Sequence, residues 1–184
     1  MFDNESGIQV KAGGVDGENR DGEDSSEQTM DYVVLKGAGL KEADFSYASM
    51  RHAILAEANL TEASLVGTDL TCADVRGAIM VGANLKGANL SAAMLNEANL
   101  QDATLRRANL SGADLQEANL RGANLKGTNL SGTDLRDSIY DEDTIWPKFF
   151  KPMDHGASPA KWFDGALIIS EEEWVPGIEA DEDN

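Results

Sequence analysis

Apolar side chains recur at every fifth position through more than half of this chain. From Leu35 to Leu135 every residue whose number is a multiple of five is apolar, and most of these residues are Leu. The residue two places earlier is nearly always Ala, so the chain repeats the pattern Ala-(Asn/Asp)-Leu-x-x, as in residues 83–87. A period of five therefore restricts the fold more than any other feature of the sequence.

This period fits neither of the regular secondary structures. On an α-helix each residue turns about 100°, so leucines five apart would be rotated by roughly 140° and would form no stripe. In a strand the side chains alternate, so an odd period would place successive leucines on opposite faces of a sheet. The recurring glycines also disfavour a helix, because each costs about 1 kcal/mol relative to Ala inside one.

A chain that turns a corner every five residues keeps each Leu inside, and four corners close a coil of about 20 residues, a short internal period typical of solenoids. Gly recurs at the fifth place of the unit, where it permits a bend, and the Asn or Asp before Leu is expected to hydrogen-bond nearby backbone. The predicted core contains the leucines of nine consecutive units: Leu85, Leu90, Leu95, Leu100, Leu105, Leu110, Leu115, Leu120 and Leu125.

The repeats resemble those of the pentapeptide-repeat family, in particular its bacterial and cyanobacterial members. Runs such as Ala-Asn-Leu-Ser-Gly at 108–112 and Ala-Asn-Leu-Lys-Gly at 123–127 carry the resemblance, which covers residues 33–137. It implies an all-β fold, a right-handed quadrilateral β-helix. At the ~4.8 Å spacing of stacked strands, the units would make about five coils and a rod roughly 25 Å long.

Composition divides the chain into three parts. Residues 1–32 hold nine acidic and two basic residues with few apolar ones, which predicts a disordered acidic tail, either solubilising or interacting. Residues 33–139 form the predicted β-helix, and its repeats at 33–137 are nearly neutral, with twelve acids and ten bases. Residues 140–184 are acidic again and differ in composition from the repeats, which indicates a separate C-terminal segment.

This C-terminal segment holds all four prolines and most of the aromatic residues of the chain. Residues 140–147 resemble a segment that often ends the coil in bacterial members of the family. Because repeat arrays need a cap over their open end, a cap with short helical turns is expected, starting near Ser158-Pro159 and near Ser170. Trp162, Phe163 and Trp174 also fit a homodimer face, and the two roles are compatible.

The coil predicts which surface residues stack, because residues 20 apart should lie on adjacent coils. His52 and Cys72 form one such pair. A Cys–His contact can activate a thiolate, but no third group orients this imidazole and a flat wall offers no pocket. We therefore predict no catalytic, metal or cofactor site, and no enzymatic activity.

A second column is basic and consists of Lys86, Arg106 and Lys126, reinforced by Arg107. These cations are candidate partner-binding residues, together with Trp162, Phe163 and Trp174. The column either receives an acidic partner or the acidic N-terminal tail, or is ordinary solvated surface.

The function that these features favour is a rigid, non-catalytic scaffold for an unidentified protein partner. The net charge of −18 disfavours direct nucleic-acid binding, and no apolar run is long enough for a membrane span. A start unlike a signal sequence and a single cysteine favour the cytoplasm. The family resemblance implies an alternative, a DNA mimic that modulates a type II topoisomerase such as gyrase, although DNA carries one charge per ~1.7 Å and the coil is nearly neutral.

Overall fold

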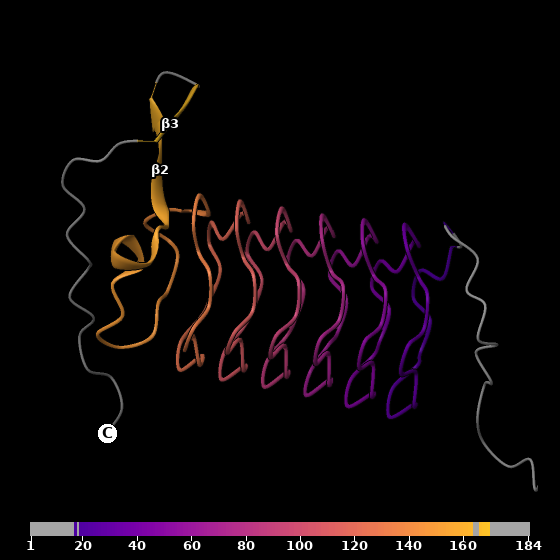
Figure 1. Cartoon of the computed structure of the whole chain (residues 1–184). Helices are drawn as coiled ribbons and strands as arrows, with labels where there is room; N and C mark the ends of the chain where they lie inside the picture. Colours follow the sequence, from indigo (N-terminus) through magenta and orange to yellow (C-terminus); the bar gives the residue numbers. More distant parts are fainter. Residues whose placement is uncertain (1–16, 18, 164–165, 170–184) are drawn as a thin grey trace, which may run out of the picture.

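The chain winds into a stack of similar coils, with a different C-terminal segment lying against one end (Figure 1). The computed structural model describes residue 17, residues 19–163 and residues 166–169. Isolated parallel bridges join residues 20 apart, for example Asn59 to Ile79 and Asn99 to Asn119. Each coil therefore contains twenty residues in four five-residue sides, as the period predicted.

The corners of the coil lie at the fifth place of each unit. Every fifth residue from Gly17 to Asp137 has a positive φ, and most of these residues are not glycine: Ala92, for example, has φ 54°. The carbonyl of the inward residue accepts a hydrogen bond from the N–H three places later, as in Ala108 to Leu105 at 3.0 Å. This is a β-turn whose third residue has left-handed backbone. The predicted bend is confirmed, but glycine is one way of making it rather than a requirement.

Where Asn or Asp precedes the inward residue, its side chain holds the next turn. The Oδ1 atom accepts the backbone N–H two residues later, at 3.2 Å from Lys86 to Asn84 and at 2.8 Å from Ser46 to Asp44. This local bond explains why Asn and Asp are the preferred residues here, and it matches the expectation from the sequence.

The core is a continuous column of apolar side chains inside the coil. All nine leucines predicted to lie there have an exposed fraction of 0%. Where Thr replaces the neighbouring Ala, its hydroxyl stays satisfied, because Thr128 Oγ1 donates to the Leu105 carbonyl at 2.6 Å and Thr68 Oγ1 to that of Phe45 at 2.7 Å. A polar atom can thus enter the bore without losing a hydrogen-bond partner.

The coil begins earlier than the sequence predicted. Residues 19–32 belong to the tail that the composition predicts to be disordered. In the structure they pair with the following coil through bridges such as Asp24 to Asp44 and Thr29 to Ser49. The predicted boundary at residue 33 is therefore too late. It was missed because the inward places of this first coil hold Arg20 and Ser25, so the apolar pattern is broken although the backbone continues.

The regular spacing of twenty residues between coils ends with strand β1 (Ile139–Tyr140). After this strand Asn124 pairs with Ile145, which is one residue out of register. A short 3₁₀ helix, η1, follows at Pro152–His155. Strand β2 (Ser158–Phe163) then pairs parallel with β1, and strand β3 (Ala166–Ile169) pairs antiparallel with β2. The three strands form one sheet in the order β1-β2-β3, which continues one wall of the coil beyond its end.

A series of aromatic rings lies between β1 and η1. Tyr140 is fully buried and meets Trp146 edge-on, with ring centroids 5.4 Å apart. Trp146 stacks on Phe150 at 5.3 Å, and Phe150 stacks on His155 at 4.6 Å. Because Trp146 and Phe150 pack against the hydrophobic core, these rings lie over its C-terminal end.

The helix expected to begin at Ser158-Pro159 is not present, because these residues open β2. Ser158 N–H donates to the Ser138 carbonyl at 2.8 Å, and Pro159 lies opposite Tyr140. The unpaired backbone at the end of the coil is thus satisfied by another strand, which a short helix would not achieve. The second expected helix, near Ser170, lies outside the described residues. Within them, no helix is long and apolar enough to cross a membrane.

Candidate functional site: a basic strip on one wall

The basic column predicted from the sequence is a continuous surface feature, which we call the basic strip: Lys86, Arg106, Arg107 and Lys126. All four side chains are exposed. Backbone hydrogen bonds between adjacent coils place these residues in a row. Gly87 N–H donates to the Arg106 carbonyl at 2.9 Å, and Arg107 N–H donates to the Lys126 carbonyl at 3.1 Å. The strip therefore extends over three adjacent coils of one wall.

The cations of the strip differ from those elsewhere on the described coil. Ion pairs hold most of the other cations of the described coil, as in Arg76 with Asp74 and Arg136 with Asp134, both at 2.6 Å, and Lys36 with Glu57 at 3.4 Å. In the part of the chain that the structure describes, no acidic side chain forms an ion pair with any residue of the strip. The neighbouring places on the wall are the neutral residues Asn84, Thr104 and Asn124.

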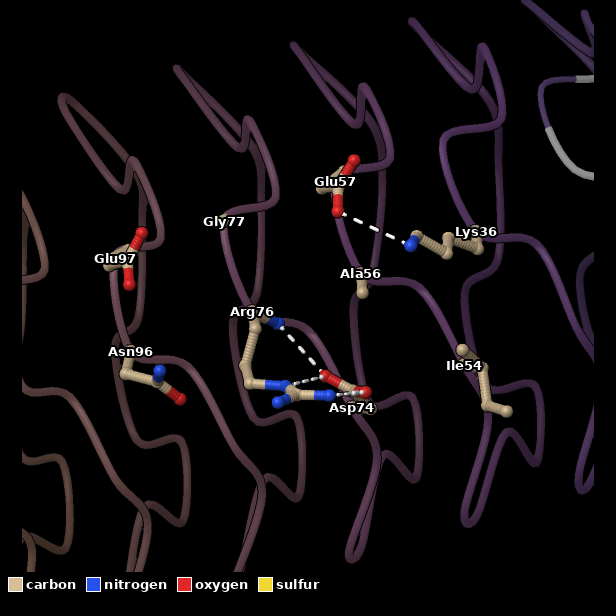
Figure 2. A pocket seen from close by; sticks show the side chains of 9 residues that line it. All are labelled: Lys36, Ile54, Ala56, Glu57, Asp74, Arg76, Gly77, Asn96 and Glu97. Carbon is tan, nitrogen blue, oxygen red and sulfur yellow. Dashed lines mark hydrogen bonds and ion pairs between the residues drawn. The ribbon is translucent and has the colours of Figure 1, made fainter.

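A shallow hollow lies on another wall, around Arg76 and Asp74 (Figure 2). Arg76 donates from Nε and Nη2 to the carboxylate of Asp74 at 2.8 and 2.6 Å, and this bonding holds the pKa of Asp74 below its ordinary value. Lys36 and Glu57 form a second pair at its rim. Since these charges already satisfy one another, the hollow offers a ligand less than the basic strip does.

The residues of the predicted His52–Cys72 pair lie on adjacent coils, since His52 N–H donates to the Thr71 carbonyl at 2.9 Å. The ring of His52 stacks on Tyr32, with centroids 4.9 Å apart and planes 5° from parallel. Cys72 is a half-buried free thiol. Among the described residues, no group of three or more His, Cys, Asp or Glu side chains is placed to hold a metal ion.

The strongest polar contact of the first coils was missed by the sequence reasoning. Arg51 donates from Nε and Nη2 to Asp31 Oδ2 at 3.0 and 2.6 Å, and Ser49 Oγ donates to Asp31 Oδ1 at 2.6 Å. These bonds lower the pKa of Asp31 from 3.8 to about 2, chiefly through Arg51. Asp31 and Arg51 are 20 apart, so the spacing rule would have found the pair if the coil had been extended to residue 19.

The aromatic candidates lie in or beyond the C-terminal sheet. Trp162 and Phe163 belong to β2, where they pair with Leu167 and Ala166 of β3. Trp174 lies outside the described residues. The backbone of Trp162 and Phe163 thus belongs to the C-terminal sheet and not to the wall that carries the basic strip.

Comparisons with known proteins agree with the repeat pattern. The sequence profile described as pentapeptide repeats, eight copies long, matches residues 38–77, 68–107 and 105–139. No curated protein is significantly similar in sequence.

Several solved structures resemble the chain. A pentapeptide repeat protein from the cyanobacterium Cyanothece 51142 is 31% identical, with 67% of this chain and 90% of that chain covered and a TM-score of 0.44. One from Nostoc PCC 7120 is also 31% identical over 55% of this chain and 84% of that chain, with a TM-score of 0.45. HetL from the same Nostoc strain, a pentapeptide repeat protein involved in heterocyst differentiation regulation, is 26% identical over 70% and 76%, with a TM-score of 0.33.

Proposed function

The chain belongs to the pentapeptide-repeat family, and we propose that it is a non-catalytic scaffold that binds a protein partner through a wall of its coil. The observation that carries the proposal is the basic strip, four exposed cations that form no ion pair with any described acidic side chain. A right-handed sense of the coil and a cytoplasmic location are parts of the same proposal.

Rigidity supports this role. The inward side chains are buried in every coil, and burial of each large apolar residue contributes about 1.5–3 kcal/mol. A surface held by such a core loses little conformational entropy on binding, so its side chains are presented already ordered. A flat wall with fixed charges is suited to recognition of a complementary surface rather than to enclosing a small molecule.

The partner proposed for the strip is an acidic surface or segment of another protein. Four cations on adjacent coils attract such a surface and repel basic ones, which favours specificity and fast association. The strip is short and the whole chain carries a net charge of −18, which disfavours nucleic acid as the ligand.

A cross-linking pull-down from the native cell tests the proposal. The bait is the full chain, compared with a strip variant in which Lys86, Arg106, Arg107 and Lys126 are changed to Ser. The matched control changes Lys36, Lys41, Lys148 and Lys151 to Ser, which removes the same charge elsewhere. We expect a partner that is captured by the wild type and the control and lost with the strip variant.

Two other outcomes would contradict the proposal. Equal capture of a partner by all three baits would show that the strip is not the contact. If the wild type captures no specific partner, the scaffold role is excluded. The DNA-mimic alternative is checked separately by a gyrase supercoiling assay. We expect no effect of the purified protein there, because the paired charges of the walls do not reproduce the charge density of DNA.

A further inference from the structure

The basic strip stacks like charges in the direction of the coil axis. Lys86, Arg106 and Lys126 occupy the same place on adjacent coils, which lie about 4.8 Å apart. Like charges directly opposite each other are destabilising. The places beside them on the wall are neutral, and no described acidic side chain forms an ion pair with them that would offset this repulsion. An anionic group bound over the strip would relieve it.

The chain itself contains a segment of matching charge. Residues 171–184 hold seven acidic residues and no basic one, grouped at Glu171–Glu173 and around Asp181–Asp183. Two clusters of carboxylates separated by a short neutral stretch complement a strip of four cations. No other stretch outside the described residues is comparable, since residues 1–16 hold three acids and a lysine.

The acidic segment follows the C-terminal sheet, which lies at the end of the rod nearer to the basic strip. It follows β3, whose Ile169 pairs with Ala160 of β2, and β2 lies on β1 at the C-terminal end of the coil. Lys126 is in a coil close to this end, since the neighbouring Asn124 pairs with Ile145, whereas the first coils, drawn in indigo, lie at the opposite end (Figure 1). The acidic N-terminal residues, which the sequence alone offered as an occupant, join the chain at the opposite end of the rod.

The acidic segment is long enough to reach the basic strip. The strip spans two coil spacings, roughly 10 Å. Fifteen residues extend up to about 50 Å, so residues 170–184 can reach around one corner of the coil and along the strip. A tether of this length gives an effective concentration on the order of millimolar, which favours binding within one chain over binding between chains.

We propose that the acidic segment 171–183 binds the basic strip of the same chain, so that the free protein covers its own charged wall. Carboxylates of the segment pair with Lys86, Arg106, Arg107 and Lys126, and a partner with an acidic surface must displace them. This contact concerns the isolated chain and holds whether or not the scaffold role proposed above is correct.

Paramagnetic NMR on the purified full chain tests the contact. A nitroxide is attached to Asn184→Cys in a Cys72→Ser background, and broadening of the backbone amide signals is measured. We expect strong broadening at residues 86, 106, 107 and 126, and little at residues 74–76 on the wall of the hollow. Salt at about 1 M, where the screening length is near 3 Å, should abolish the difference.

Three variants make the result specific. Changing Lys86, Arg106, Arg107 and Lys126 to Ser should remove the broadening, while the control with Lys36, Lys41, Lys148 and Lys151 changed to Ser should keep it. Changing all seven acids of the segment, Glu171, Glu172, Glu173, Glu179, Asp181, Glu182 and Asp183, to Gln should also remove it. This last variant leaves the coil untouched, so its effect cannot arise from misfolding of the strip.

The proposal is overturned if both walls broaden equally, if neither does, or if the strip and glutamine variants behave as the wild type. A mixture of ¹⁵N-labelled chain without nitroxide and unlabelled chain with nitroxide distinguishes the source. Broadening in the mixture as strong as in the single chain would assign the segment to a second copy and overturn the intramolecular contact.

Discussion

At the scale of the residue, two kinds of side chain decide the behaviour of this protein, the buried leucines and the paired surface charges. The leucines have no alternative position, because the bore of the coil is lined on every side by its own backbone. The surface charges, in contrast, are held by local partners whose removal changes the pKa of a group without affecting the core.

We expect Leu105→Asp to abolish folding. Leu105 has an exposed fraction of 0%, and a carboxylate placed there would be buried without a partner at a cost of several kcal/mol, a large part of the stability of a domain. Circular dichroism and thermal melting measure the effect. Asn84→Asp is the control, because it adds the same charge at an exposed place. A Leu105→Asp protein that melts like the wild type would refute the inward position of this leucine.

The pair of Asp31 and Arg51 predicts a specific dependence on pH. The pKa of Asp31 is lowered from 3.8 to about 2, so the ionised form is favoured in the folded state. The resulting stabilisation is present above pH 3.8 and is lost as the pH falls toward 2. With Arg51→Gln we expect the pKa of Asp31 to rise toward its ordinary value.

An NMR titration of the Asp31 carboxyl group measures this change. Arg76→Gln provides the control, since Arg76 bonds to Asp74 and should leave the pKa of Asp31 where it is. An unchanged titration of Asp31 in Arg51→Gln would show that another group, such as the Ser49 hydroxyl, lowers the pKa.

At the scale of the element, the unit of this fold is a corner followed by a short bridge. The corner requires a positive φ every five residues, yet the sequence fills many corners with Glu, Asp, Tyr or Arg. Each of these residues adopts a backbone that L-amino acids disfavour by about 1–2 kcal/mol. Stacking of the coils, which supplies several hydrogen bonds per turn, holds the residues there.

Replacing one such corner residue by Gly should therefore stabilise the protein. We expect Ala92→Gly, at φ 54°, to raise the free energy of unfolding. The gain should be about 0.5–1 kcal/mol, because relief of the left-handed strain exceeds the added entropy of the unfolded chain. Chemical denaturation measures it. Ala56→Gly, the same change at a buried place without positive φ, should destabilise instead. A loss of stability in both variants would contradict the corner argument.

At the scale of the whole molecule, the coil is a rod with one covered end and an uneven distribution of charge. Ion pairs hold most of the cations outside the basic strip on the described coil, and the excess acid of the chain lies in residues 1–32 and 138–184. Such a molecule presents local charged surfaces rather than a uniform field. The basic strip is the clearest of these surfaces on the described coil.

The C-terminal sheet predicts self-association. β3 is the edge strand of the sheet β1-β2-β3, and its sequence Ala-Leu-Ile-Ile carries no charge or proline that would discourage pairing with another chain. We expect sedimentation of the full chain to show a dimer of the 19.7 kDa protomer. Changing Trp162, Phe163 and Trp174 together to Ala should shift it to the monomer, whereas Tyr47→Ala, at an exposed aromatic residue of the coil, should not. A monomer at all concentrations would exclude this interface.

The sequence alone determined the repeating part of this protein, because a period of five has few geometrical solutions. It predicted the corner at the fifth place, the inward Leu105 and the stacking of residues 20 apart, and from that spacing it placed Lys86, Arg106 and Lys126 in one column. These are local or strictly periodic properties, so they can be read without knowledge of distant contacts.

Only the tertiary structure decided where the periodicity begins and ends and which charges are neutralised. Ser25 is buried at an inward place because the coil above it supplies the backbone ladder, and Ser158 opens a strand because the exposed edge of β1 needs a partner. Likewise, a column of cations in the sequence becomes a candidate site only when the structure shows that no described acid forms an ion pair with it. Each of these depends on contacts that adjacent coils or the C-terminal segment supply, and such contacts form only when the chain is folded.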